Sequence, residues 1–383
     1  MIKKKIAFVV AIPGTAEAFL TSHLEVLTKE YDVSLIANFP DNYENPQFSE
    51  MNVRLINAPI ERKISIKKDL TALFKLAKIL KKEHFDSVHS ITPKAGLLSA
   101  VASWMAGIKN RIHIYTGQVW ATRKGVMRYF LKLLDKTISC LDTQILVDGE
   151  GQRQFLIKEG VIKAKNSTVL ANGSICGVKL KNFVISETTR ENERKKFGFS
   201  TDDVVFIFLG RLNHDKGIGE LFAAFNKMAS ECPNAKLLLY GSDEERYDAK
   251  SAEYPNIRKG ENYFYPGPTP KPYDALQGGD VFVLPTWREG FGMSVIEAQA
   301  LGLPVITTDA YGVCDTSVVN ETGLRCKVGD SDTLYQCMTT LYSNSEMRKQ
   351  FGAAGRERVE KLFDSKIVSK AWADFYHKIF ING

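Results

Sequence analysis

The stretch Val281–Asp309, with the sequence VFVLPTWREGFGMSVIEAQALGLPVITTD, predicts the fold of the whole chain. Val281–Leu284 is a short apolar run typical of a buried parallel strand. Met293–Leu301 is rich in helix-forming residues, a Gly-Leu-Pro sequence ends this helix, and Val305–Thr308 is the next expected strand. A strand, a loop, a helix and a strand in this order place the loop at the carboxyl edge of a parallel sheet, where open α/β folds bind ligands.

Two carboxylates flank the start of this expected helix. Glu289 lies in the loop, and Glu297 lies about one turn into the helix. Between them, the helix amino terminus offers the unpaired N–H groups of Gly292 and Met293, which form a natural site for an anion. A diphosphate bound there would bring a ribose diol near Glu297, and Glu289 would face the group attached to the far phosphate.

The segment Glu289–Glu297, EGFGMSVIE, resembles the E-x7-E signature of the retaining glycosyltransferases of family 4, which share the GT-B fold. The resemblance rests on the longer sequence LPTWREGFGMSVIEAQALGLPVI, and it extends over nearly the whole chain. It implies an α/β protein of the GT-B type, in which two Rossmann-like domains face a central cleft. It also implies a C-terminal helix that returns to the N-terminal domain.

Length and composition agree with a two-domain α/β protein. A chain of 383 residues exceeds what one hydrophobic core usually supports, and 44% hydrophobic with 25% charged residues is typical of a globular protein. Strands and helices alternate in both halves, so each half is expected to hold a parallel sheet. The predicted domains are 1–180 and 181–362, with a terminal helix over 363–383. The segments 166–177 and 188–196 are expected to form the crossing.

Several classes of protein are not indicated. No segment approaches the ~18 uncharged apolar residues of a transmembrane helix, and the apolar run near the start fits a first strand better than a signal peptide. The six cysteines lack paired spacing, so we expect reduced thiols in a cytoplasmic protein. The first loop, Ile12–Thr15, lacks the G-x-G-x-x-G pattern of a dinucleotide site.

A second loop supplies cations for the expected diphosphate. Arg211 and Lys216 lie in GRLNHDKG, after the first strand of the second domain. In the family that this chain resembles, a similar Arg and Lys-Gly element contacts the donor diphosphate, whose charge grows as it departs. The predicted catalytic residues are Glu289, Arg211 and Lys216. The predicted nucleotide-sugar-binding residues also include Gly14, Gly290, Phe291, Gly292, Met293, Ser294 and Glu297.

No metal is expected to be required. Asp330 and Asp332 have the D-x-D spacing of a metal motif, but they follow a surface-like loop and are interpreted as a helix cap. The donor is expected to be a UDP-sugar, and in the family that the chain resembles the transfer retains the anomeric configuration.

The first domain departs from the family in one respect. Family members often carry a histidine that touches the donor sugar, but here His113 lies inside an expected strand and fits a packed core residue. The residues predicted to contact the sugar or the acceptor are Lys94, Thr116, Gly117 and Gln118. The loops around them, together with Tyr311–Asp315, resemble transferases that build O-antigen and capsule repeat units on a polyprenyl diphosphate.

Charge is divided unevenly between the two halves. Residues 1–185 contain 27 Lys and Arg against 16 Asp and Glu, a balance of +11, and the remaining 198 contain 24 against 28, a balance of −4. The basic helices expected within Arg62–Lys82 and Trp120–Lys136 carry aromatic residues, which is typical of the interface of an anionic bilayer. We expect peripheral binding to the inner face of the cell membrane, and no nucleic acid, because the aromatics are not interleaved with the basic residues as in known binding modules.

These features predict a retaining glycosyltransferase that moves a hexose or N-acetylhexosamine from a UDP-sugar to a polyprenyl-diphosphate-linked saccharide. Two alternatives are compatible with the sequence. One is an isomerase similar to the sugar-nucleotide 2-epimerases, and the other is a nucleotide-sugar-binding protein without catalysis. The basic helices favour the transferase, since an epimerase has no lipid acceptor.

Overall fold

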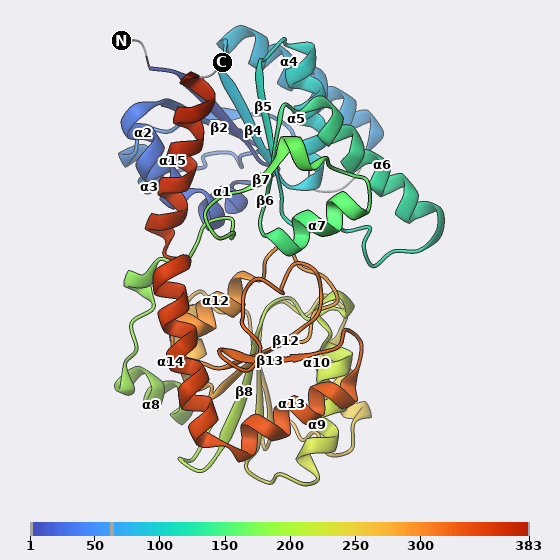
Figure 1. The fold of residues 1–383 in the computed structure, drawn as a ribbon, viewed down its shortest axis with the longest axis vertical. Coiled ribbons are helices and arrows are strands. Elements are labelled where there is room, and N and C mark those ends of the chain that lie inside the picture. Colours follow the sequence, from blue (N-terminus) through green and yellow to red (C-terminus); the bar gives the residue numbers. More distant parts are fainter. Residues whose placement is uncertain (1–2, 62–64, 382–383) are drawn as a thin grey trace. The chain divides into compact units, whose positions relative to one another are not determined.

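The computed structural model of the protein describes residues 3–61 and 65–381, and it contains two compact units (Figure 1). Unit 1 comprises Met1–Gly177 together with Ser365–Gly383, and unit 2 comprises Val178–Asp364. Unit 2 is therefore continuous in sequence, whereas unit 1 is built from two separate segments. The domain limits predicted from the sequence, at positions 180 and 362, remain predictions.

Unit 1 is built on a seven-stranded parallel sheet with the strand order β3-β2-β1-β4-β5-β6-β7. The order reverses between β1 and β4, as in doubly wound α/β folds. The central strands are buried and apolar because helices cover both faces of the sheet (Figure 1). The strands are β1 Lys5–Val9, β2 Asp32–Ala37, β3 Arg54–Asn57, β4 Ser87–Ile91, β5 Asn110–Tyr115, β6 Gln144–Val147 and β7 Ser167–Val169.

The helices of unit 1 form two layers. Helices α2 and α15 pack together on one face of the sheet, and α4, α5 and α6 follow one another on the other face (Figure 1). The helices are α1 Pro13–Phe19, α2 Thr21–Glu30, α3 Pro46–Glu50, α4 Ile66–Glu83, α5 Pro93–Met105, α6 Gly125–Leu141, α7 Glu150–Lys158 and α15 Ser365–Ile381.

Unit 2 contains a six-stranded parallel sheet with the strand order β10-β9-β8-β11-β12-β13. Its strands are β8 Val204–Leu209, β9 Ala235–Tyr240, β10 Tyr263–Gly267, β11 Val281–Leu284, β12 Val305–Thr308 and β13 Gly323–Cys326. Its α-helices are α8 Glu187–Lys195, α9 Ile218–Ala229, α10 Tyr247–Lys250, α11 Pro272–Ala275, α12 Met293–Ala300, α13 Ser331–Ser343 and α14 Ser345–Leu362. The strand–loop–helix–strand unit predicted within 281–309 is confirmed.

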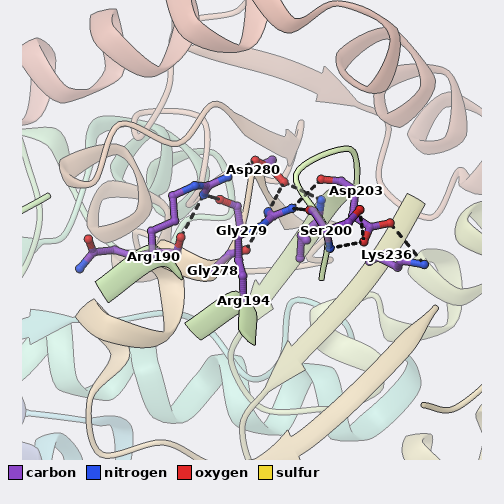
Figure 2. A network of polar contacts seen from close by, with 10 residues as sticks. Arg190, Arg194, Ser200, Asp203, Lys236, Gly278, Gly279 and Asp280 are labelled. Atoms are coloured by element: carbon purple, nitrogen blue, oxygen red, sulfur yellow. Dashed lines mark hydrogen bonds and ion pairs between the residues drawn. The ribbon is translucent and has the colours of Figure 1, made fainter. Parts of the chain in front are cut away.

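The charged run 188–196, expected to be part of a crossing between domains, lies almost wholly within helix α8. Arg190 and Arg194 are four residues apart on one face of this helix, and both reach the carboxylate of Asp280, which directly precedes β11 (Figure 2). Arg194 also donates to two backbone carbonyls in the loop before β8, at 2.6 and 2.8 Å. The basic residues of this run therefore attach α8 to the sheet of unit 2.

The last helix, α15, packs against α2 within unit 1, which confirms the predicted return of the terminal helix to the N-terminal domain. Trp372 is fully buried between two imidazole rings, with ring centroids 4.1 Å from His23 and 4.7 Å from His89 and nearly parallel planes. His89 Nδ1 lies 2.8 Å from the hydroxyl of Tyr376, also on α15. Burial holds the pKa of His89 well below its usual value, so this imidazole is neutral in the fold.

Candidate active site

The predicted donor-site residues of the second domain come together at one edge of the unit 2 sheet. β8 and β11 are neighbours where the strand order reverses, and both end at the same edge because the sheet is parallel. The loop after β8 contains Arg211 and Lys216, and the loop after β11 contains Glu289 and leads into α12. This topological switch point is where open α/β sheets bind their ligands.

Lys216 and Glu289 form an ion pair between these two loops. The side chains are largely buried, at 16% and 15% exposed, so the pair is shielded from most of the solvent. Two residues predicted to act on the donor are therefore in direct contact although they lie 73 positions apart. Each charge therefore neutralises the other.

Arg211 occupies the same loop as Lys216, but its side chain is exposed and pairs with Glu244, with Nη1 3.1 Å from Oε2. Asn213 Nδ2 donates to the same carboxylate at 2.7 Å. Glu244 follows β9, the strand beside β8, and its part in the site was missed by the sequence analysis. No spacing in the sequence indicates it, because the contact depends on which strands are neighbours.

Two glycines allow the surrounding loops to approach one another closely. Gly217 has a φ of +71°, and a Cβ there would lie 1.9 Å from the backbone oxygen of Pro285. A Cβ on Gly312 would lie 1.9 Å from the backbone oxygen of Glu289. A side chain at either position would push the loops apart. Gly312 belongs to the segment Tyr311–Asp315, so this segment packs directly against the backbone of the Glu289 loop.

Helix α12 begins directly after Gly292, whose φ of +93° is one that glycine adopts readily and other residues do not. Met293 and Ser294 are half-buried in its first turn, and the amino terminus of a helix attracts an anion. Gly290 is buried in the loop, and Phe291 packs its ring edge-on against Phe363 with centroids 5.4 Å apart. The Phe291 ring is therefore part of the core, and only its backbone can face a ligand.

Glu297 lies one turn into α12 and is half-buried. Burial raises the pKa of Glu297 from its usual value to about 7. A carboxyl group that is close to half ionised at neutral pH can accept hydrogen bonds from a diol. This property suits the role in ribose binding that the sequence predicts for Glu297.

Unit 1 has a switch point of its own, between β1 and β4. Gly14 is exposed in α1 after β1, and Lys94 is in the first turn of α5 after β4. Lys94 Nζ lies 2.6 Å from a carboxylate oxygen of Asp69, and both side chains are largely buried. Thr92, at the start of α5, has a φ of +74°, a strained conformation for a β-branched residue of the kind found at functional sites.

The three residues predicted to contact the sugar follow β5. Thr116 is half-buried, and Gly117 has a φ of +121°. The side chain of Gln118 is fully buried, and its Oε1 accepts a hydrogen bond from Gln152 Nε2 at 3.2 Å. Gln118 therefore supports the loop from inside, which leaves Thr116 and the Gly117 backbone as the candidates for sugar contact.

His113 is a core residue, as expected from its place in a strand. It is buried on β5, and its Nδ1 lies 2.9 Å from the hydroxyl of Ser90. Burial lowers the pKa of His113 to about 3, so it is neutral throughout the physiological range.

The D-x-D sequence at Asp330 and Asp332 is a helix cap. Asp330 precedes α13, and its carboxylate accepts a hydrogen bond from the backbone N–H of Thr333 at 2.9 Å. Within residues 3–61 and 65–381, no group of three or more His, Cys, Asp or Glu side chains is placed to hold a metal ion. The expectation that activity requires no metal remains a prediction.

Comparison with known proteins identifies the family. The capsular polysaccharide biosynthesis glycosyltransferase CapM of Staphylococcus aureus is 32% identical over 349 residues, which cover 91% of this chain and 90% of CapM. The chain belongs to the glycosyl transferases of group 1. The model of that family, Glycosyl transferases group 1, matches residues 189–358, which contain both loops of the unit 2 site.

Two further proteins are similar to this glycosyltransferase, one in sequence and one in fold. UDP-Gal:alpha-D-GlcNAc-diphosphoundecaprenol alpha-1,3-galactosyltransferase of Escherichia coli is 27% identical over 348 residues, covering 88% of each chain. The crystal structure of HepE from Anabaena in complex with UDP and glucose matches with a TM-score of 0.79 at 16% identity, covering 98% of this chain and 99% of HepE. The fold is GT-B, with two Rossmann-like domains, as the sequence predicted.

The surface of unit 1 in this glycosyltransferase carries exposed apolar side chains on two helices, α4 and α6, which both pack against α5. On α4, Ala72, Leu76 and Leu80 are buried, whereas a second stripe at four-residue spacing faces solvent. The structure therefore separates the apolar residues of α4 into a packed face and an exposed face. The exposed apolar residues are Ile66, Leu70 and Phe74 on α4 and Val126, Met127, Tyr129, Phe130 and Leu133 on α6.

The inclusion of Trp120 among the surface aromatics was wrong. Trp120 is 1% exposed, and its indole N–H donates to Asp135 Oδ2 at 2.7 Å. Arg128 and Lys132 both pair with Glu159, at 2.9 and 2.6 Å, so this one carboxylate balances one of their two positive charges. Two further cations of the expected surface, Arg62 and Lys63, lie outside the described residues. Among the described helices, none combines the length and the apolar character needed to cross a bilayer.

Proposed function

We propose that this glycosyltransferase moves a hexose or an N-acetylhexosamine, with retention of configuration, from a UDP-sugar to a polyprenyl-diphosphate-linked saccharide during the assembly of a bacterial surface polysaccharide. The observation that supports this most is the grouping of Lys216, Glu289 and the start of α12 at the unit 2 switch point. The Escherichia coli relative, whose name specifies a UDP-sugar donor and an undecaprenyl-diphosphate acceptor, indicates the two substrate classes.

The donor residues have separate roles in this proposal. Lys216, Arg211 and the first N–H groups of α12 hold the diphosphate and stabilise its growing charge as the bond to the sugar breaks. Glu297 binds the ribose hydroxyls. Glu289 faces the transferred sugar, where positive charge develops at the anomeric carbon. The departing phosphate accepts the proton of the incoming hydroxyl, so leaving group and acceptor lie on the same face of the sugar.

We assign the acceptor to unit 1 and the enzyme to the cytoplasmic face of the membrane. The exposed apolar side chains of α4 and α6 are accompanied by exposed cations, among them Lys67, Lys75 and Lys78 on α4 and Arg123 and Lys124 before α6. Apolar residues flanked by lysine and arginine suit the interface of an anionic bilayer, and each cation near the surface contributes about 1 kcal/mol. Thr116 and the Gly117 backbone are the proposed sugar contacts.

A donor screen tests the proposed function. The full chain is incubated with each of several UDP- and GDP-sugars, with and without a short polyprenyl-diphosphate saccharide, and nucleotide release and lipid product are measured. We expect UDP release that requires the acceptor and continues in EDTA. Epimerised sugar formed without acceptor would instead establish an isomerase, and binding of UDP without turnover of any donor would establish a non-catalytic protein.

Two substitutions connect the activity to the proposed site. Lys216→Ala and Arg211→Ala should each lower turnover by about 2–4 kcal/mol of lost charge stabilisation. Glu321→Gln, which removes an exposed carboxylate elsewhere in unit 2, serves as the control and should leave turnover unchanged. Wild-type turnover in both the lysine and the arginine variant would remove the phosphate site from the proposal.

A further inference from the structure

The two donor loops of unit 2 are joined by contacts that involve none of the residues assigned so far. Arg288 donates through Nε and Nη2 to a single carboxylate oxygen of Asp215, at 2.9 and 2.6 Å. The backbone oxygen of Asp215 accepts from Thr286 Oγ1 at 2.9 Å and from the Trp287 N–H at 2.8 Å. We call these four hydrogen bonds the loop clasp. They join the loop after β8 to the loop after β11 through one residue, Asp215.

The members of the clasp are the chain neighbours of the residues that act on the donor. Asp215 directly precedes Lys216, and Arg288 directly precedes Glu289. A shift of the clasp would therefore move the Lys216 ammonium and the Glu289 carboxylate at the same time. Because Gly217 already touches the backbone of Pro285, the loops have no space in which to shift without separating.

The clasp is also anchored to the sheet. The hydroxyl of Thr308, the last residue of β12, donates a hydrogen bond to the backbone oxygen of Thr286 at 2.7 Å. Both Thr286 and Thr308 are fully buried. The polar contacts thus run from β12 through the β11 loop to the β8 loop, and the geometry of Lys216 is tied to three strands.

We propose that Asp215 and Arg288 are positioning residues, which hold the Lys216 ammonium where the donor diphosphate binds. Arg288 is largely buried, at 15% exposed, and the fork of its guanidinium is occupied by the Asp215 carboxylate. Arginine forms such a two-donor contact in a fixed plane, whereas lysine provides one mobile charge. The clasp therefore fixes the loops by shape as well as by charge. This inference rests on the proposed function, because it takes a UDP diphosphate as the ligand.

Calorimetry with UDP distinguishes positioning from simple electrostatics. Asp215→Asn removes a negative charge close to Lys216, so electrostatics alone predicts tighter binding of UDP. Positioning predicts the opposite, a loss of at least about tenfold, because Lys216 no longer makes a charge-assisted hydrogen bond of full strength. Arg288→Lys keeps the charge but loses the fork, and it should weaken UDP binding in the same way.

A double-mutant cycle gives the decisive result. In a Lys216→Ala background, the addition of Asp215→Asn or Arg288→Lys should cost nothing further in UDP affinity, since the group that the clasp positions is gone. Glu261→Gln, which breaks an exposed ion pair with Arg258, is the matched control and should bind UDP as the wild type does. Melting temperatures of all variants report whether each one folds.

Three results would overturn the clasp: tighter UDP binding by Asp215→Asn, wild-type affinity in both single variants, or losses that add to the loss from Lys216→Ala. A tightening in Asp215→Asn with a weakening in Arg288→Lys would show that Arg288 itself contacts the phosphates. If the cycle behaves as expected but no donor is turned over with any acceptor, the proposed transferase activity is wrong, whereas the positioning role of Asp215 and Arg288 is supported. If the wild type does not bind UDP, both are wrong.

Discussion

The contact between Lys216 and Glu289 has a consequence for how the donor would bind. The Glu289 carboxylate is paired with the ammonium group that the diphosphate would bind. Donor binding therefore replaces one anionic partner of Lys216 with another. The exchange would leave Glu289 without its cation at the moment when a sugar carbon with developing positive charge lies nearby. An ionised carboxylate in a shielded site would stabilise that charge most strongly in the transition state.

This exchange can be tested by replacing Glu289 with an isosteric neutral residue. Glu289→Gln should lower turnover by roughly 100-fold, while UDP affinity stays the same or becomes tighter because Lys216 loses its competing partner. Steady-state kinetics and calorimetry with UDP measure the two effects separately. A loss of UDP affinity with normal turnover of bound donor would mean that Glu289 binds the nucleotide and that its assigned role is wrong.

The raised pKa of Glu297 predicts a pH-dependent nucleotide affinity. The ionised carboxylate is the form that accepts hydrogen bonds from both ribose hydroxyls, and with a pKa of about 7 it becomes populated as the pH rises through neutrality. UDP should therefore bind more tightly at pH 8 than at pH 6. Calorimetry across this range should show the dependence in the wild type and a much weaker one in Glu297→Gln. An equal slope in both would assign the dependence to the UDP phosphates.

At the scale of single elements, the sequence predicted the buried apolar strands well, and two short strands were missed. β11 and β12 are continuous buried runs with clear ends, and both were located to the residue. β7 and β13 were missed, because three or four residues of mixed character carry no periodic signal and become strands only beside a neighbour.

The candidate site was also predicted only in part. Lys216 and Glu289 follow apolar strands in chain order, so their presence at one sheet edge could be inferred from the sequence. The pairing of Arg211 with Glu244 and the burial of Gln118 could not, because they depend on strand order and on packing between distant segments. The docking of α15 came only from the family resemblance, since the periodicity of a helix does not indicate its partner.

The ring stack around Trp372 predicts that α15 is essential to the stability of unit 1. Trp372→Ala would leave a cavity between His23 and His89, and it should cost about 3–5 kcal/mol of unfolding free energy. Trp104→Ala is the matched control, because Trp104 is 61% exposed on α5 and should be nearly neutral. Denaturant unfolding followed by circular dichroism measures both. Equal midpoints would show that the stack contributes no stability.

At the scale of the whole molecule, the division of charge predicts how the protein meets a bilayer. Liposomes with anionic lipid should bind the protein at low salt and release it at high salt, because the cations of α4 act through a screened attraction. Neutralising Lys67, Lys68, Lys75 and Lys78 should abolish flotation with the liposomes, and Phe74→Ser should weaken it at all salt concentrations.

A control for this experiment comes from the other unit. Lys327, Lys349 and Lys361 are exposed in unit 2, and their neutralisation removes a similar charge without changing α4 or α6. This variant should float as the wild type does. If the α4 and the unit 2 variants behave alike, the attraction is a property of net charge and the proposed membrane face is wrong.

Because the chain completes unit 1 only after it has passed through unit 2, the first 177 residues leave the ribosome without the helix that carries Trp372. Unit 1 stays incomplete until its last, seventeen-residue helix has been translated, and until then the ring faces of His23 and His89 are uncovered. Unit 2, in contrast, is translated without interruption and can fold first. An expression fragment should therefore be designed as an excision of Val178–Asp364, with the flanking ends rejoined, and not as a truncation after Gly177.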